Sequence, residues 1–199
     1  MSEFTDLVAI IVHCVDEDEP LPLHVVVALA NGRLEAMWAK SSDPNSMGKL
    51  MVLTYAELPA ALAVQVAERA AQKIAKPVEP WAEDRIDNIL RELHYQLVGT
   101  SDNSIREIER DVERYGTTKA ISQRQRFAWH AISTAITAVR HETEELEPGY
   151  YRYTSGITNS VIDTVYHAWA ASVPGEWLAD LLRPFGPPSL ERIVQRLTR

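Results

Sequence analysis

Cysteine is almost absent from this chain of 199 residues, in which Cys14 is the single example. One cysteine cannot form an internal disulfide bond, so the fold has to be held by a hydrophobic core, which a chain of this length can build. The first residues also lack the cationic stretch of a secretory signal, since Ser2, Glu3 and Asp6 precede the first apolar run. Both observations predict a protein of the reducing cytoplasm.

Long apolar runs are missing as well. The longest ones, at residues 7–15 and 23–30, are far shorter than the roughly 20 residues of a membrane-spanning helix, so we expect no membrane span. Hydrophobic residues make up 46% of the sequence and charged residues 24%, as in ordinary globular proteins. These values predict a single compact globular unit.

Positive charge is the third shortage, because the formal net charge is -8 at pH 7. Residues 1–100 contain 15 acidic and 8 basic side chains, so most of the negative charge belongs to the N-terminal half. Nucleic acids and anionic membrane surfaces attract proteins with a positive field, and we therefore expect neither direct nucleic-acid binding nor membrane binding. A basic protein partner fits this charge better.

Motifs with a known reaction mechanism are also lacking. The sequence has no HExxH pair, no GxSxG elbow, no CxxC, no EF-hand loop and no GxGxxG turn. Residues 43–50 share only Gly48 and Lys49 with a phosphate-binding loop, because Asp43 stands in place of its first glycine. We accordingly expect a protein without a cofactor, and one that is more readily explained as a binding protein than as an enzyme.

Helical periodicity dominates what the sequence does contain. The stretch 117–147 predicts one long helix, because its apolar residues recur at three- and four-residue steps. The stripe consists of Ile121, Ala128, Ile132, Ala135, Ile136, Val139 and Leu146. Phe127, Trp129 and Ala138 extend the apolar surface beyond that stripe, so the helix is expected at the centre of the fold.

The N-terminal residues carry strand signals rather than helical periodicity. A β-branched run at residues 4–15, and the pair Asn31 and Gly32 between two apolar stretches, favour strands joined by a tight hairpin turn. Leu34, Ala36 and Trp38 alternate as in a half-buried strand with Arg33, Glu35 and Met37, although a helix over 22–39 is an alternative. We predict a mainly α, α+β fold: a small antiparallel β-meander at 1–54 packed on a helical domain at 55–199. The alternative is an all-α fold.

Two groups of residues are candidates for partner binding. A loop between two well-defined helices carries Tyr150, Tyr151, Arg152 and Tyr153, and these residue types are enriched at binding hot spots because they bury large area and keep a polar end. The other group is an acidic run of Asp16, Glu17, Asp18 and Glu19, which would attract a basic partner. The alternatives are tyrosines packed over helix ends and a solvated loop.

A metal site is the other candidate. His141 and Glu145 are four residues apart on one predicted helix, and Asp163 and His167 are four apart on the next. If these pairs faced each other, they would supply carboxylates and imidazoles as in metal-binding helical bundles. The alternative is that both pairs lie on solvated faces as simple neighbours.

The resulting hypothesis is an acidic, cytoplasmic protein-binding module that acts on a basic protein partner. One concrete form is a bacterial small inhibitor or immunity-type protein, and another is an adaptor. A helical enzyme that binds a metal or a small ligand through His141, Glu145, Asp163 and His167 is the first alternative. The second is a self-associating structural subunit, or homo-oligomer, that uses Trp177, Phe185 and the last helix.

Overall fold

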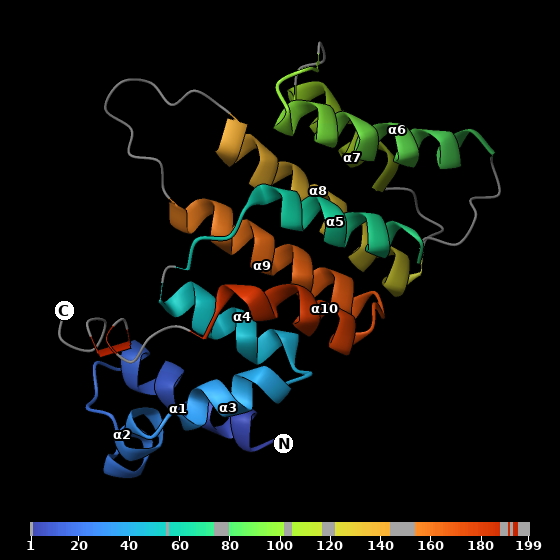
Figure 1. Ribbon diagram of the computed structural model, residues 1–199. Helices are drawn as coiled ribbons and strands as arrows, with labels where there is room; N and C mark the ends of the chain where they lie inside the picture. The colour runs from blue at the N-terminus through green and yellow to red at the C-terminus, as the bar shows by residue number, and fades with distance from the viewer. Residues whose placement is uncertain are drawn as a thin grey trace, which may run out of the picture. The chain divides into compact units, whose positions relative to one another are not determined.

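The computed structural model describes residues 2–54, 56–73, 80–101, 105–116, 122–143, 154–187, 191, 193 and 194. Over these residues the chain forms ten α-helices and one 3-10 helix and has no strand (Figure 1). None of the helices in this part of the chain is both long and apolar enough to cross a membrane. The mainly helical prediction is confirmed, and the all-α alternative is the correct form of it.

The helices belong to two units. The first consists of Met1–Ala56 and Gly175–Arg199, and the second of Glu57–Pro174. The first contains α1 (Glu3–Asp16), α2 (Leu23–Ala30), α3 (Arg33–Lys40), α4 (Pro44–Leu53), α10 (Gly175–Leu182) and the 3-10 helix η1 (Arg183–Phe185). The second contains α5 (Ala60–Ala71), α6 (Pro80–Leu97), α7 (Ile105–Gly116), α8 (Gln123–Thr143) and α9 (Thr154–Ala170). The first unit is discontinuous in sequence, because the chain returns to it at Gly175.

The β-branched run near the N-terminus is helix α1, and the strand predicted there is wrong. Its buried side chains are Phe4, Leu7, Val8, Ile11 and Cys14, which lie at the three- and four-residue steps of one helix face. The hydroxyl of Ser2 accepts a hydrogen bond from the Thr5 amide and so caps the first turn. Burial along one face therefore outweighs the β preference of the individual residues.

The predicted hairpin at Asn31 and Gly32 is also wrong, because these residues join two helices. Gly32 does adopt a positive φ of 69°, but it follows the end of α2, and its amide donates to the Leu29 carbonyl. Leu34 and Trp38 are both buried four residues apart on α3, which a helix face explains as well as strand alternation does. The single helix over 22–39 is likewise replaced by two short ones.

Helix α4 occupies the last part of the region 1–54 that was predicted as a β-meander. Asp43 accepts hydrogen bonds from the amides of Asn45 and Ser46 and thereby caps the helix, and Pro44 occupies its first position. Met47, Leu50 and Met51 are then fully buried, and α4 contacts α1 and α10 of the same unit. Every strand of the predicted meander is thus helical in the structure.

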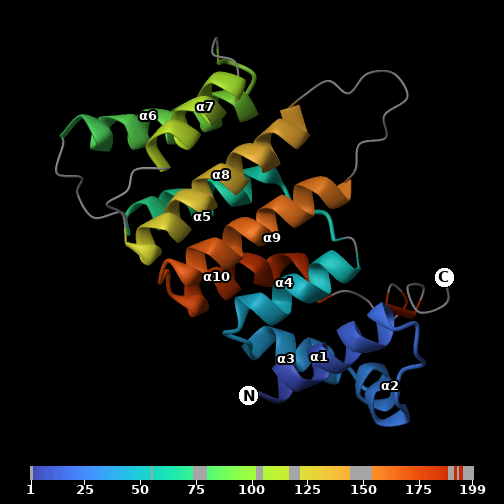
Figure 2. The same cartoon turned by 180° about the vertical axis from the view of Figure 1, so that it is seen from behind.

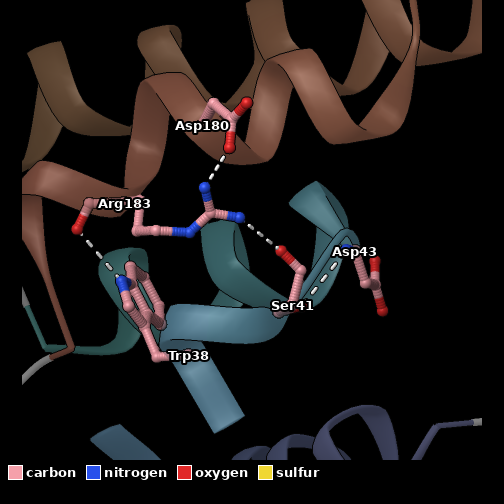
Figure 3. Close-up of polar contacts among 5 residues, drawn as sticks. All are labelled: Trp38, Ser41, Asp43, Asp180 and Arg183. Atoms are coloured by element: carbon pink, nitrogen blue, oxygen red, sulfur yellow. Dashed lines mark hydrogen bonds and ion pairs between the residues drawn. The ribbon is translucent and has the colours of Figure 1, made fainter. Parts of the chain in front are cut away.

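A polar cluster joins the C-terminal part of the first unit to α3 and α4 (Figure 3). The indole of Trp38 donates a 3.1 Å hydrogen bond to the Arg183 carbonyl, and the Arg183 guanidinium donates to the Ser41 carbonyl at 2.9 Å. The same guanidinium pairs with Asp180, while the Ser41 hydroxyl accepts from the Asp43 amide. Arg183 therefore connects α10 to the turn between α3 and α4 within this unit.

Close packing reinforces this connection. The backbone of Gly186 lies against the indole of Trp38, and a Cβ at residue 186 would be 2.6 Å from a ring atom. Phe4 also contacts Trp38, and its ring meets the indole edge-on with centroids 6.2 Å apart. Trp38 is therefore enclosed by residues from both ends of the sequence of this unit.

Helix α8 is the middle of the second unit. It contacts α5, α6, α7 and α9, and the views from both sides show it running alongside α9 (Figures 1 and 2). Its buried residues are Ala128, Trp129, Ala131, Ile132, Ala135, Ile136, Ala138 and Val139. Alanines make up half of this set and allow the neighbouring helices to approach closely. The long helix predicted over 117–147 extends beyond α8 at both ends, and residues 117–121 and 144–147 lie outside the described residues.

Candidate protein-binding surface

Helix α2 is eight residues long and is apolar on two sides. Seven of its residues, all except His24, are aliphatic. Val25 and Leu29 are buried and lie four residues apart, so they form the face that packs onto the rest of the unit. This face accounts for only two of the seven aliphatic side chains.

The other side of α2 faces solvent. The exposed fractions are 78% for Leu23, 40% for Val26 and 49% for Val27, and Ala30 is exposed as well. Spacings of three, four and seven residues place these four side chains on one helix face, which we call the α2 stripe. Clustered exposed aliphatic residues on a protein surface typically mark a surface that another molecule covers.

The acidic run lies between α1 and the α2 stripe. Asp16, Glu17, Asp18 and Glu19 are all exposed, and none of them forms an ion pair with another described residue. Asp16 is the last residue of α1 and the other three follow it, at the end of the helix where the macrodipole disfavours negative charge by a few tenths of a kcal/mol or more per group. Helix stability therefore does not explain why acidic residues occupy these positions.

Asp18 adds a conformational cost. Its φ is 56°, in the left-handed region that glycine adopts most easily. The Glu19 amide donates a 2.8 Å hydrogen bond to the Cys14 carbonyl, which completes a glycine-type helix end without a glycine. The carboxylate is thus present where both charge and backbone geometry favour another residue.

Two adjoining hollows flank α2, and we call them together the α1–α2 groove. The larger has a volume of about 640 Å³ and is lined by Leu23, Val27 and Asn31 of the α2 region. The smaller measures about 210 Å³ and is lined by Glu3, Asp6, Leu7 and Ile10 of α1 and by Met37 of α3. His24, Ala28 and Arg33 line both hollows. The α2 stripe therefore borders a groove with apolar and acidic walls.

The remaining predicted partner-binding residues cannot be placed. Tyr150, Tyr151, Arg152 and Tyr153 lie outside the described residues, and so does Glu145 of the predicted metal site. Of the residues predicted for self-association, Trp177 is half-buried in α10 and Phe185 is exposed at η1. The last helix is described only at residues 191, 193 and 194.

The structure does not bring His141 to His167. The ring of His141 lies over the first turn of α9, about 3.7 Å from where a Cβ on Gly156 would be. His167 is eleven residues further along the same helix, which corresponds to about 16 Å. No group of three or more histidine, cysteine, aspartate or glutamate residues in the described ranges is arranged to hold a metal ion.

His167 instead belongs to a cluster of rings that the sequence analysis missed. Its imidazole lies 5.3 Å from that of His130, 6.1 Å from the stacked ring of Phe127 and 5.6 Å from Tyr166, measured between ring centroids. Burial and the neighbouring His130 lower the pKa of His167, although Asp163 acts in the opposite direction. Burial in turn raises the pKa of Asp163, and His167 opposes that shift. This cluster is a contact between α8 and α9 that disfavours the protonation of His167.

Comparison with known proteins adds nothing to this description. No protein-family model, no curated protein and no solved structure matches the chain. The surface of the molecule is therefore the basis on which its function has to be inferred.

Proposed function

We propose that the protein is an acidic protein-binding module that docks onto a basic protein partner through the α2 stripe and the acidic run. The observation that carries the proposal is the stripe itself. Four aliphatic side chains on one face of α2 are left in water, although the helix already has a buried face with Val25 and Leu29. A partner that covers this face removes apolar surface from water and gains about 25 cal/mol for each Å² buried.

Charge around the stripe supports a basic partner. Residues 1–40 contain seven acidic side chains and two basic ones, so these first helices hold much of the net charge of -8. Glu19 is four residues before Leu23 and hence at most about 14 Å from it along the chain. Lysines and arginines around an apolar patch on the partner would therefore meet the acidic run as the patch covers the stripe. Such charge pairs mainly speed association and select the partner.

Self-association through the same surface is disfavoured. Two copies of the chain would bring two acidic runs together, and like charges at close range oppose binding. The stripe is also short, since eight residues of helix measure about 12 Å. An interface of standard size needs about 800 Å² from each partner, so the occupant has to be a protein that reaches beyond the stripe.

A module of this kind acts on its partner in one of two ways. It inhibits the partner when the basic surface that it covers is the working surface, and it serves as an adaptor when a second protein binds elsewhere on it. Both actions depend on the same docking surface. The test can therefore address the surface before the consequence of binding is known.

Native mass spectrometry of two matched variants tests the proposal. The protein is purified gently at low ionic strength from its source cell as wild type, as Val27→Asp and as Ala36→Asp. Both substitutions add one negative charge at an exposed helix position, but only Val27 belongs to the α2 stripe. We expect a partner mass on the wild type and on Ala36→Asp, and its loss from Val27→Asp. Raising the salt concentration should weaken the complex further.

Three results would contradict the proposal. The first is a wild-type chain without any bound protein, and the second is a partner that Val27→Asp retains. The third is equal loss from both variants, because that would indicate a general effect of added charge. Thermal unfolding of each variant, measured alongside, shows whether the fold is intact.

A further inference from the structure

The walls of the α1–α2 groove are both two helical turns long. On α1 the lining residues run from Glu3 to Ile10, and along α2 they run from Leu23 to its C-cap residue Asn31. Eight or nine residues of α-helix measure about 12–14 Å, so the groove matches the length of a short helical segment. Grooves between helices commonly bind an amphipathic helix that inserts side chains three, four and seven residues apart.

The smaller hollow has the size and lining of a site for one anchoring side chain. Leu7, Ile10 and Met37 make it apolar, and its volume of about 210 Å³ is below the range of roughly 300–1,000 Å³ typical of small-molecule sites. Met37 is half-buried, and its unbranched side chain can adapt to the shape of an inserted group. An aliphatic or aromatic side chain of a partner fits this description better than a free metabolite.

One edge of the same hollow is acidic. Glu3 already pairs with Arg33, but the exposed Asp6 forms no ion pair with any other described residue. Asp6 is four residues before Ile10 on α1, which is about one turn or 6 Å. A cation one turn away from the anchoring side chain on a bound helix would therefore reach the Asp6 carboxylate.

We infer that the α1–α2 groove binds one amphipathic helix of the partner, with an aliphatic or aromatic anchor in the smaller hollow and a lysine or arginine at Asp6. The inference rests on the proposed function, because the same helix would cover Leu23 and Val27 of the α2 stripe along the larger hollow. A second copy of this chain is a poor occupant. Its own apolar helix α2 contains no lysine or arginine to offer Asp6.

A synthetic peptide tests the groove directly. The probe is an acetylated and amidated helix of about 14 residues with leucines on one stripe and lysines on its flanks, and its affinity is measured by fluorescence anisotropy. Ala28→Trp fills the wall that both hollows share, whereas Ala36→Trp places the same ring at an exposed position outside them. We expect at least a tenfold loss of affinity for Ala28→Trp and less than a twofold change for Ala36→Trp.

Changes of charge provide the second arm of the test. Asp6→Asn should weaken peptide binding severalfold and reduce its dependence on salt, and Glu176→Gln, an exposed substitution on α10 outside the groove, should not. Replacing the peptide's lysines with glutamates should abolish binding. Equal effects of Ala28→Trp and Ala36→Trp, or none from Ala28→Trp, would overturn the inference.

An NMR titration and a comparison of two variants show whether the groove inference or the proposed function fails. If Ala28→Trp does not fold, the wild-type protein is titrated with the peptide and followed by NMR. Chemical-shift changes confined to residues away from Asp6, Ile10, Ala28 and Met37 would then contradict peptide binding in the groove. If the partner from the source cell is lost with Val27→Asp but kept by folded Ala28→Trp, the groove inference fails while the proposed function stands. If both variants keep the partner, both fail.

Discussion

Helices α8 and α2 are both apolar on more than one side, but they differ in what covers them. Helix α8 contacts the four other helices of its unit, and eight of its residues are buried. Helix α2 buries Val25 and Leu29 and leaves its stripe in water. The comparison shows that a helix with excess apolar surface needs neighbours on every apolar side. Where the chain supplies them the helix is structural, and where it does not we expect a partner.

The largest effect should come from the covered helix. Ile132 of α8 is fully buried, so Ile132→Ala leaves a cavity and should lower the free energy of unfolding by about 2–5 kcal/mol. Ser133→Ala, an exposed substitution on the same helix, should change it by less than about 0.5 kcal/mol. Urea denaturation of both variants measures the difference. Similar values for the two would mean that α8 is not packed as described.

Val25 and Val27 lie on different faces of α2, the first on its buried face and the second on its exposed face. Val25→Ala removes two buried methyl groups and should lower the free energy of unfolding by about 2 kcal/mol. Val27→Ala, at a half-exposed position of the stripe, should change it by less than about 0.5 kcal/mol. Partner binding should be weakened more by Val27→Ala than by Val25→Ala. A loss of stability as large for Val27→Ala as for Val25→Ala would show that the stripe is a structural face.

The acidic run should be worth more to binding than to stability. Asp18→Gly relieves the positive φ and removes one charge at the end of α1, so it should raise the free energy of unfolding by up to about 1 kcal/mol. Asp18→Asn, which keeps a side chain, separates the charge effect from the backbone effect. Thermal unfolding measures both variants. A lower melting temperature for Asp18→Gly than for the wild type would contradict the account of this helix end.

The smallest effect is a pH dependence in the covered region. The pKa of His167 is lowered from its usual value of about 6.5, so the folded state binds this proton less readily than the unfolded state. The stability that depends on neutral His167 is therefore present above pH 6.5 and is lost as the pH falls below it. Denaturation at pH 7.5 and pH 5.5 should show a smaller decrease for His167→Phe than for the wild type. An equal or larger decrease would rule out His167 as a cause.

Prediction from the sequence succeeded where a helix is long and regular. The stripe containing Ile132, Ile136 and Val139 repeats over several turns, and these residues are buried in α8. A glycine that follows an apolar stripe predicts a helix end, and Gly99, just after α6, has the left-handed φ of 70° that is typical of such an end. In both cases the signal comes from adjacent turns of the same helix.

The hairpin was predicted wrongly because its signal has two structural meanings. A glycine with positive φ is needed both in a tight hairpin turn and just after a helix, and Gly32 serves the second purpose. Leu34 and Trp38 fit strand alternation and also the four-residue step of a helix. Only contacts with residues distant in sequence, such as the one between Trp38 and Arg183, distinguish the two.

The candidate surface could be predicted only in part. An acidic run such as Asp16 to Glu19 is expected to be exposed from its composition, and it is. The helix ends at Asp18 and Ser172 have a positive φ without glycine, so the residue type does not predict these helix ends. Which side of α2 stays uncovered depends on tertiary packing, since its sequence is aliphatic all round. For the same reason the contact of His167 with His130 on another helix was not foreseen.

Site-specific photo-crosslinking in the source cell tests the central claim most directly. A photoreactive benzoylphenylalanine replaces Val26 of the α2 stripe in one variant and the exposed Ala36 of α3 in the other, and irradiation captures whatever lies against each position. The account predicts a crosslink from position 26 to one basic protein and none to that protein from position 36. It would be contradicted if position 26 gave no crosslink, or if both positions gave the same products.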